Sequence, residues 1–138
     1  MKEKTVLIYL EENKSYLMLF RNKKKHDINK NKWVGIGGHI EDGETPNQAI
    51  IREVKEETNL DLISLDYRGL LHFINNDYEE DIYLYTSNAF KGTLEECNEG
   101  ELRFIPFNDL MSLNMWEGDK IFLPLLINNE PFFELTLI

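Results

Sequence analysis

The pattern of apolar and polar residues divides the chain into short strands around one well-marked helix. Two strand-like runs, 5–10 and 15–20, surround a polar turn and predict an opening hairpin. Two longer runs, 62–74 and 81–90, flank the polar turn Asn75-Asn76-Asp77 and predict a second hairpin. Towards the C-terminus the pattern predicts a short strand, two helices and a terminal strand, at 101–105, 108–113, 119–128 and 132–138.

The helix in the middle of the chain has clear signals at both ends. Thr45 is placed to cap its first turn, Pro46 suits the first helical position, and Gln48 completes a capping-box spacing with Thr45. The pattern continues to Thr58, and Asn59 is a residue type that tolerates the left-handed conformation in which many helices end. The sequence therefore predicts a helix over residues 46–58.

Apolar and acidic residues occupy different sides of this helix. At 100° per residue, Ile50, Ile51 and Val54 fall along one side and are expected to pack in the core. Three glutamates share another side, which is expected to face outward: Glu53, Glu56 and Glu57. Glutamates three or four residues apart repel each other by roughly 0.2–0.5 kcal/mol per pair, so local stability does not favour this arrangement. The acidic side is either an ordinary solvated surface or a set of oxygen ligands for Mg²⁺.

The composition indicates one globular domain that spans residues 1–138. Of its side chains, 42% are hydrophobic and 29% are charged, and no repeat or linker divides the chain. The order of strands and helices favours an α+β fold. No apolar run is long enough to cross a membrane and no signal-peptide core follows Met1, so we expect a cytoplasmic protein without membrane contacts. The single Cys97 excludes an internal disulfide and a cysteine-built zinc site.

The charge balance limits the partners of the chain. A formal net charge of −10 argues against binding to long nucleic acids, which requires Lys and Arg in place of counterions. A small polyphosphate can still bind when divalent cations stand between its oxygens and the carboxylates. The basic segment 21–32, which includes Lys23, is either a solvated loop or a region that attracts a phosphorylated ligand. The glycine-rich segment 35–38 allows unusual dihedral angles and close approach of a ligand or metal to the backbone. These patterns do not specify an oligomeric state.

Gly38, Glu44 and the segment 52–60 together resemble the Nudix box. That motif is a glycine, five residues, a glutamate, seven residues, then Arg-Glu-aliphatic-any-Glu-Glu, one further residue, a glycine and an aliphatic residue. Asn59 stands in place of the last glycine, which a left-handed cap makes tolerable. The resemblance implies the Nudix fold, a mixed β-sheet between α-helices, and a hydrolase that uses Mg²⁺ or Mn²⁺ to cut the diphosphate linkage of a nucleotide.

The resemblance also implies roles for individual residues. The metal ligands would be Gly37, through its carbonyl, and Glu53, Glu56 and Glu57. The catalytic residues would be Glu44, Arg52, Glu53 and Glu56. Glu53 is the preferred general base, whereas Glu44 and Arg52 would mainly brace the loop against the helix. Gly38 and His39 would face the substrate phosphates, although His39 is equally compatible with a solvent-facing loop position.

Three further segments resemble those of MutT-like Nudix enzymes, which hydrolyse oxidised purine nucleoside triphosphates: Lys32-Trp33, Cys97-Asn98-Glu99-Gly100 and Trp116-Glu117-Gly118-Asp119. The resemblance makes Glu99 a distal metal ligand, and it places Trp116 and Asp119 against the purine by stacking and hydrogen bonding. The alternatives are a surface acid at Glu99 and a core anchor at Trp116. Gly118 and Val34 depart from the pattern, because those enzymes have an acid and an asparagine there.

The expected reaction is hydrolysis of a nucleoside triphosphate to a nucleoside monophosphate and pyrophosphate, with 8-oxo-dGTP as one candidate substrate. A Nudix hydrolase of dinucleoside polyphosphates, ADP-ribose or an isoprenoid diphosphate is the first alternative. A non-catalytic module that senses a nucleotide is the second. The intact acidic positions of the box favour an enzyme.

Overall fold

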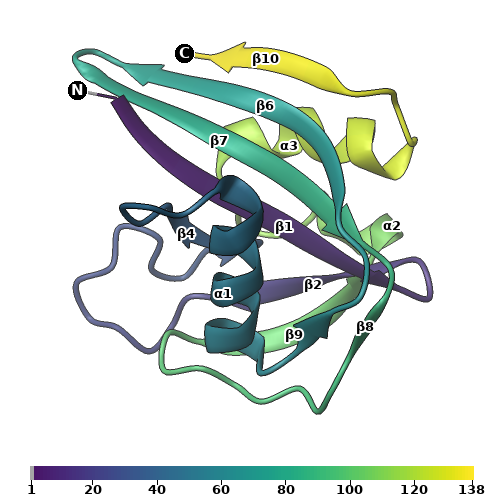
Figure 1. Ribbon diagram of the computed structural model, residues 1–138. Coiled ribbons are helices and arrows are strands. Elements are labelled where there is room, and N and C mark those ends of the chain that lie inside the picture. The colour runs from purple at the N-terminus through teal and green to yellow at the C-terminus, as the bar shows by residue number, and fades with distance from the viewer. Residues whose placement is uncertain (1) are drawn as a thin grey trace.

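The computed structural model describes residues 2–138, which form ten strands and three helices (Figure 1). The strands are β1 (Lys2–Glu12), β2 (Ser15–Phe20), β3 (Trp33–Val34), β4 (Ile36–His39), β5 (Asp61–Leu62), β6 (Asp66–Asn75), β7 (Tyr78–Ser87), β8 (Phe90–Lys91), β9 (Glu101–Pro106) and β10 (Phe133–Leu137). The helices are α1 (Pro46–Thr58), α2 (Phe107–Leu110) and α3 (Glu117–Ile127). None of the helices in this part of the chain has the length and apolar composition that crossing a membrane requires.

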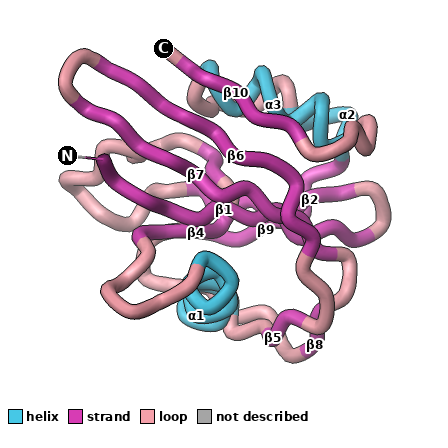
Figure 2. Tube along the Cα trace, turned by 45° about the horizontal axis from the view of Figure 1, so that its top comes forward, coloured by secondary structure: helices cyan, strands magenta, loops and turns pink. Residues whose placement is uncertain are grey.

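A mixed sheet forms the middle layer of the molecule. Its strands follow the order β10-β6-β7-β1-β2-β3, with β4 paired to β1 and β9 paired to β2. The pairs β1–β7 and β6–β10 are parallel, while the other pairs in this sheet are antiparallel. Helix α1 covers one face and α3 the other (Figure 2). The expected α+β architecture, with a mixed sheet between helices, is therefore present.

Alternation along β1 supplies one hydrophobic core on each face of the sheet. Val6 and Ile8 belong to the core beneath α1, together with Val54 of that helix. Tyr9 belongs to the opposite core, together with Phe122 of α3. Successive side chains of a strand point to opposite faces, so this one strand anchors both helical layers.

The two expected hairpins are both present, but the first is short. In β1 and β2 only Glu11–Tyr16 and Glu12–Ser15 pair, around the turn at Asn13 and Lys14, whose φ angles are positive (51° and 56°). Beyond the turn β1 pairs with β7 and β4, whereas β2 pairs with β9 and β3. The second hairpin, β6–β7, is long, but its strands reach further into the predicted turn than expected, to Asn75 and from Tyr78. The outer ends of the predicted runs were wrong, because β5 and β8 separate from the hairpin and form their own two-stranded sheet.

Helix α1 begins and ends where the sequence predicts. The Gln48 backbone N–H donates to Thr45 Oγ1 (3.2 Å), and the Thr45 N–H donates to Gln48 Oε1 (2.9 Å). Asn59 ends the helix in the left-handed conformation, with φ of 67°, and its N–H donates to the Lys55 carbonyl. The expected caps are confirmed.

The predicted faces of α1 were partly wrong. Ile51 is 51% exposed rather than packed in the core, because the buried side is centred on Ala49, Ile50 and Val54. Glu57 lies on that buried side and is only 8% exposed, so the acidic side does not simply face outward. The direction of the helix face is set by where α1 meets β4 and β1, which periodicity alone does not specify.

The C-terminal elements differ from prediction mainly at their ends. Helix α2 is a single turn that starts at Phe107, and α3 starts two residues before the predicted position 119. The terminal strand β10 pairs in parallel with β6 at the edge of the sheet. The side chains of β10 therefore lie beside the start of α3.

His72 links three strands at this edge, which makes the stability of the protein depend on pH. Its Nδ1 lies 2.7 Å from Asp81 Oδ1 on β7, and its Nε2 lies 2.6 Å from Glu134 Oε2 on β10. A neutral imidazole has one N–H, so both nitrogens donate only when the ring is protonated. The hydrogen bonds with Glu134 and Asp81 accordingly raise the pKa of His72.

A group whose pKa is raised by folding stabilises the protein fully below its unfolded pKa, about 6.5 for histidine, and this stabilisation is lost as the pH rises through the folded pKa. We expect the wild type to lose more unfolding free energy than His72→Gln between about pH 5.5 and 8.5, as measured by urea denaturation. The control His26→Gln replaces an exposed histidine and should follow the wild type. Parallel curves for wild type and His72→Gln would contradict this role of His72.

Candidate active site

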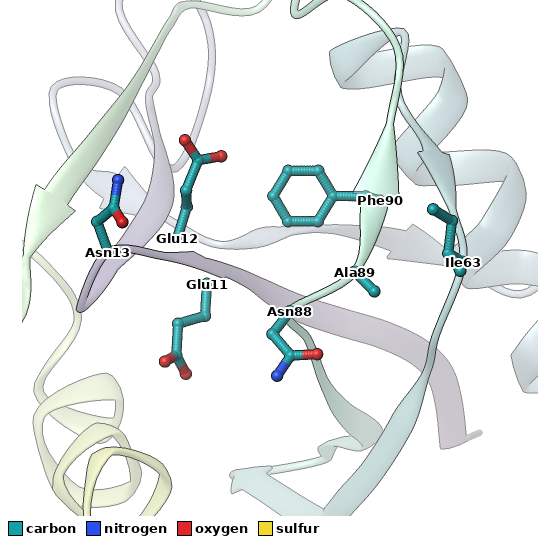
Figure 3. A pocket seen from close by; sticks show the side chains of 7 residues that line it. All are labelled: Glu11, Glu12, Asn13, Ile63, Asn88, Ala89 and Phe90. Carbon is teal, nitrogen blue, oxygen red and sulfur yellow. The ribbon is translucent and has the colours of Figure 1, made fainter.

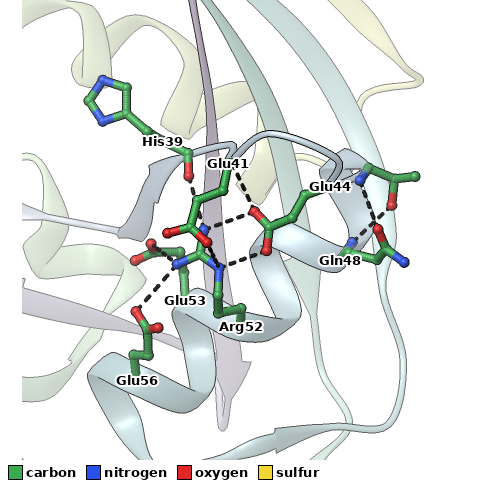
Figure 4. A network of polar contacts seen from close by, with 8 residues as sticks. His39, Glu41, Glu44, Gln48, Arg52, Glu53 and Glu56 are labelled. Carbon is green, nitrogen blue, oxygen red and sulfur yellow. Dashed lines mark hydrogen bonds and ion pairs between the residues drawn. The ribbon is translucent and has the colours of Figure 1, made fainter.

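One guanidinium holds together the loop before α1, the end of β4 and α1 itself (Figure 4). Arg52 donates two hydrogen bonds to Glu44, from Nε (2.7 Å) and Nη2 (3.0 Å). Its Nη1 donates to Glu53 (2.7 Å) and Glu56 (3.3 Å), and its Nη2 also reaches the His39 carbonyl (3.1 Å). Arg52 and Glu44 thus connect the loop to the helix, as expected from the sequence. Their importance for catalysis stays a prediction.

The ion pair fixes the charge of its members. Hydrogen bonding from Arg52, followed by that from the Glu41 backbone, lowers the pKa of Glu44. The same contact, chiefly through Glu44 and then Glu53, raises the pKa of Arg52. Glu44 and Arg52 therefore remain a carboxylate and a cation over the whole neutral range.

Glu57 stands in a different environment from Glu44. It points from α1 towards β4, where the Gly37 N–H donates to its Oε2 (3.3 Å). Burial, followed by the charges of Glu99 and Glu53, raises the pKa of Glu57 to about 9. Burial is also the main reason why the pKa of Glu53 is raised, despite its bond with Arg52. The negative charges of Glu53 and Glu99 therefore act on Glu57 in a space where burial also disfavours its charged form.

This donor set fits a divalent cation. Hard cations such as Mg²⁺ prefer carboxylate oxygens, and the proton that Glu57 holds in the free protein is one a metal displaces. Within residues 2–138 no three acidic, histidine or cysteine side chains already form a metal cage, and Glu53 is turned onto Arg52. The residues that fit the cation are Glu53, Glu57 and Glu99, with Gly37 beside them. The Glu56 side chain is 58% exposed and lies further out.

Two glycines of β4 permit this close arrangement. A Cβ on Gly37 would lie 2.0 Å from the Val6 carbonyl oxygen, and a Cβ on Gly38 would lie 2.7 Å from the Glu53 carboxylate. Neither glycine uses the dihedral freedom that the segment allows, because among the described glycines only Gly43 and Gly92 have positive φ. The segment requires glycine for space instead.

A single cleft of about 1260 Å³ joins the acidic end of α1 to the start of α3. The predicted residues that line it are Gly37, Gly38, His39, Glu53, Glu57, Glu99, Trp116 and Asp119. The predicted residues outside its lining are Lys23, Glu44, Arg52 and Glu56. The cleft therefore brings together side chains that lie more than sixty positions apart in the sequence, from residue 53 to residue 119.

Trp116 is not a core anchor. It is 40% exposed at the start of α3, and its Nε1 donates to Asn29 Oδ1 (2.7 Å). Lys32 Nζ lies over the indole, 4.7 Å from the ring centroid. The loop between β2 and β3 thus contacts one face of the indole ring. The ring lines a cleft that can receive a flat ligand.

Asp119 and Gly118 define the chemistry next to Trp116. Burial raises the pKa of Asp119 to about 7, so this carboxyl can either donate or accept a hydrogen bond near neutral pH. A Cβ on Gly118 would lie 3.0 Å from Leu137 Cδ1 of β10. A second acidic side chain at position 118 would therefore crowd the terminal strand.

The basic segment between β2 and β3 mainly holds Glu99. Arg21 Nη2 and Lys24 Nζ each lie 3.5 Å from Glu99 Oε1. Lys23 instead donates to the Cys97 carbonyl (3.1 Å), outside the cleft. Arg21 carries only a weak sequence signal for this role, since it follows the predicted strand 15–20 and opens the basic segment.

A second, smaller hollow of about 460 Å³ lies away from this site (Figure 3). Its lining is Glu11, Glu12, Asn13, Ile63, Asn88, Ala89 and Phe90. No residue predicted for catalysis or binding lies there, and its charged groups are acidic. The larger cleft is therefore the candidate active site.

Comparisons with known proteins agree with this geometry. A NUDIX domain model matches residues 1–126, so the chain belongs to the NUDIX domain family. It is 29% identical over 104 residues to an uncharacterized Nudix hydrolase, YvcI, of Bacillus subtilis strain 168, covering 71% of this chain and 66% of that protein. It is 28% identical over 111 residues to an oxidized purine nucleoside triphosphate hydrolase of Danio rerio, covering 79% of this chain and 71% of that protein.

The fold is also that of solved MutT structures. The MutT protein of Bacillus halodurans superimposes with a TM-score of 0.84 at 18% identity, covering 97% of this chain and 89% of that one. The predicted family and fold are thereby confirmed. Relatives named as hydrolases support the expected enzyme class.

The two β4 glycines give a matched test of the site. We expect Gly38→Ala to keep the fold, because the new Cβ meets the flexible end of Glu53, but to lower turnover by about 100-fold through displacement of that carboxylate. Gly37→Ala should instead cost about 3 kcal/mol or more, because its Cβ meets the backbone of β1. Circular dichroism during thermal unfolding and nucleotide hydrolysis measure both effects. Full turnover by a folded Gly38→Ala would show that the position of Glu53 is unimportant.

Proposed function

We propose that this chain is a divalent-cation-dependent hydrolase that converts a purine nucleoside triphosphate to the monophosphate and pyrophosphate. The observation that carries the proposal is that one cleft is lined by Glu53, Glu57 and Glu99 at one end and by Trp116 and Asp119 at the other. A nucleotide has the same two-part chemistry, with an anionic phosphate chain and a flat base. The name of the Danio rerio relative points in the same direction.

The acidic end would receive the phosphates. Bound Mg²⁺ or Mn²⁺ would neutralise phosphate oxygens and make a coordinated water more acidic. Glu53, Glu57 and Glu99 would hold the cation, with Glu56 close enough along α1 to assist. Gly38 and His39 border the same part of the cleft, where their small or exposed groups leave room for the phosphate chain.

Glu53 is the group best placed to accept the proton of the attacking water. Burial raises its pKa, which makes the carboxylate a stronger base than an exposed glutamate. Arg52 holds one oxygen of Glu53 and leaves the carboxylate facing the cleft. Glu44 in turn fixes Arg52 from the other side with two hydrogen bonds. Water would attack one phosphorus, and pyrophosphate would leave as the P–O bond breaks.

The other end would recognise the base. The indole of Trp116 offers a flat surface for stacking, and Asp119 offers a carboxyl whose pKa of about 7 suits either hydrogen-bonding role. Oxidised purines such as 8-oxo-dGTP are the proposed substrates. Val34 and Gly118 mean that the base would be held by fewer polar side chains than the MutT-like pattern implies. A cytoplasmic location, where nucleotide pools are found, fits this role.

A substrate panel tests the proposal. Hydrolysis with Mg²⁺ should be monitored through chromatographic identification of the products for the common nucleoside triphosphates, 8-oxo-dGTP, 2-oxo-dATP, ADP-ribose, a diadenosine polyphosphate and an isoprenoid diphosphate. Pyrophosphate release is measured for the nucleoside triphosphates, the substrates that yield it in the proposed reaction. We expect an oxidised purine triphosphate to exceed the common pyrimidine triphosphates in kcat/KM by about 10-fold or more, since base stacking and one good hydrogen bond are each worth about 1–3 kcal/mol. Preference for the isoprenoid diphosphate, which has no base, would refute the base pocket, and preference for ADP-ribose would refute a nucleoside triphosphate as the substrate. Failure to hydrolyse any of them would refute the enzymatic role.

A further inference from the structure

A buried hydroxyl at the base end of the cleft has no partner in the free protein. Among residues 2–138 the buried side-chain oxygens or nitrogens without a hydrogen bond are Tyr9 Oη and Asn22 Oδ1, and of these two residues Tyr9 alone lines the cleft. Tyr9 is fully buried on β1. Burying a hydroxyl without a partner costs free energy, so folding alone does not explain why this position carries tyrosine rather than phenylalanine.

The Tyr9 ring is held rigidly in place. Its centroid lies 5.4 Å from that of Tyr16 and 6.2 Å from that of Phe122 on α3. The ring therefore cannot swing out to water, and its hydroxyl is fixed under the floor of the cleft. Tyr9 lines the cleft although it is buried, so a ligand atom reaches its hydroxyl when the groups that cover it move aside.

Asp119 is the neighbouring polar group. It lies in the first turn of α3 and lines the same cleft. After burial, the charge of Asp119 is the largest cause that raises the pKa of Tyr9, which agrees with their place in one cleft. No hydrogen bond joins them in the described structure, so the Tyr9 hydroxyl is free to donate to a third group.

A hydroxyl that donates beside a carboxylate that accepts is complementary to a carbonyl beside an N–H. That pair is the lactam edge of an oxopurine, whereas adenine presents an amino group beside a bare ring nitrogen. Building on the proposed function, we infer that Tyr9 is a specificity-determining residue, whose hydroxyl donates to the lactam carbonyl while Asp119 accepts from the adjacent N–H. A buried water that joins Tyr9 and Asp119 is the structural alternative.

The inferred role of Tyr9 and the buried-water alternative predict opposite effects of Tyr9→Phe on the unfolding midpoint. If the Tyr9 hydroxyl has no partner until substrate binds, Tyr9→Phe removes an unpaired buried group from the free protein. The unfolding midpoint of the free protein then rises by about 4 °C. The same variant loses selectivity: the ratio of kcat/KM for dITP, a lactam, to that for dATP falls by about 10-fold, through KM for dITP rather than kcat. The control is Tyr16→Phe, a buried neighbour outside the cleft lining, which should keep the wild-type ratio.

The experiment uses the full chain with Mg²⁺, with both deoxynucleotides assayed for wild type and both variants. An unchanged dITP to dATP ratio in Tyr9→Phe, with the wild type active, would overturn the role of Tyr9 alone. A lowered midpoint with an unchanged ratio would identify the buried water as the partner of Tyr9. A wild type that hydrolyses neither these nor any other nucleoside triphosphate would overturn the proposed function first, and the inference with it.

Discussion

Negative charge crowded onto one helix is the constraint that organises this structure, and Arg52 is the cation that makes it tolerable. Its guanidinium bonds to Glu44, Glu53 and Glu56 and to the carbonyl of His39. Without it, these three carboxylates would repel one another in a partly buried space. Arg52 nevertheless compensates only the outer part of the cluster, and Glu57 lies beyond its reach beside Gly37. The remaining imbalance is what a divalent cation would correct.

The rest of the fold places these acidic side chains at one end of a cleft. Strand β1 supplies side chains to both cores, so α1 and α3 pack on opposite faces of the same strand. Gly37 lets β4 lie close to β1, and Gly38 leaves space on β4 for the Glu53 carboxylate. Trp116 and Asp119 arrive from α3, and β10 closes the wall beside them. A nucleotide-sized cleft therefore follows from how two layers meet at one strand.

Features with local causes could be predicted from the sequence, and features with long-range causes could not. The capping box at Thr45 and the left-handed Asn59 depend on neighbouring residues, and the structure has both. The exposure of Ile51 and the burial of Glu57 depend on which side of α1 meets the sheet. The parallel pairing of β1 with β7 and of β6 with β10 joins distant segments, for which periodicity gives no register.

The residues of the candidate site also differ in whether a local sequence pattern identifies them. The spacing within the Nudix box identifies Glu53 and Glu57 because all its positions lie on one loop and one helix. Glu99 and Trp116 could be proposed only from weaker resemblance, and the structure brings both to the cleft. Tyr9 carries no sequence signal, since an aromatic residue in an apolar strand reads as ordinary core. Lys23 had a signal in its basic segment, but its ammonium group contacts the Cys97 carbonyl instead of the cleft.

Binding of Mg²⁺ to the free protein tests the central claim most directly, because it does not depend on the substrate. The account predicts that isothermal titration calorimetry at about pH 7.5, in buffers of different ionisation enthalpy, will show binding coupled to proton release, since the pKa of Glu57 is about 9 without metal. Glu57→Gln should bind about 10-fold more weakly or worse and release no proton, while the exposed control Glu130→Gln should match the wild type. Equal Mg²⁺ affinity in Glu57→Gln and wild type would contradict the account.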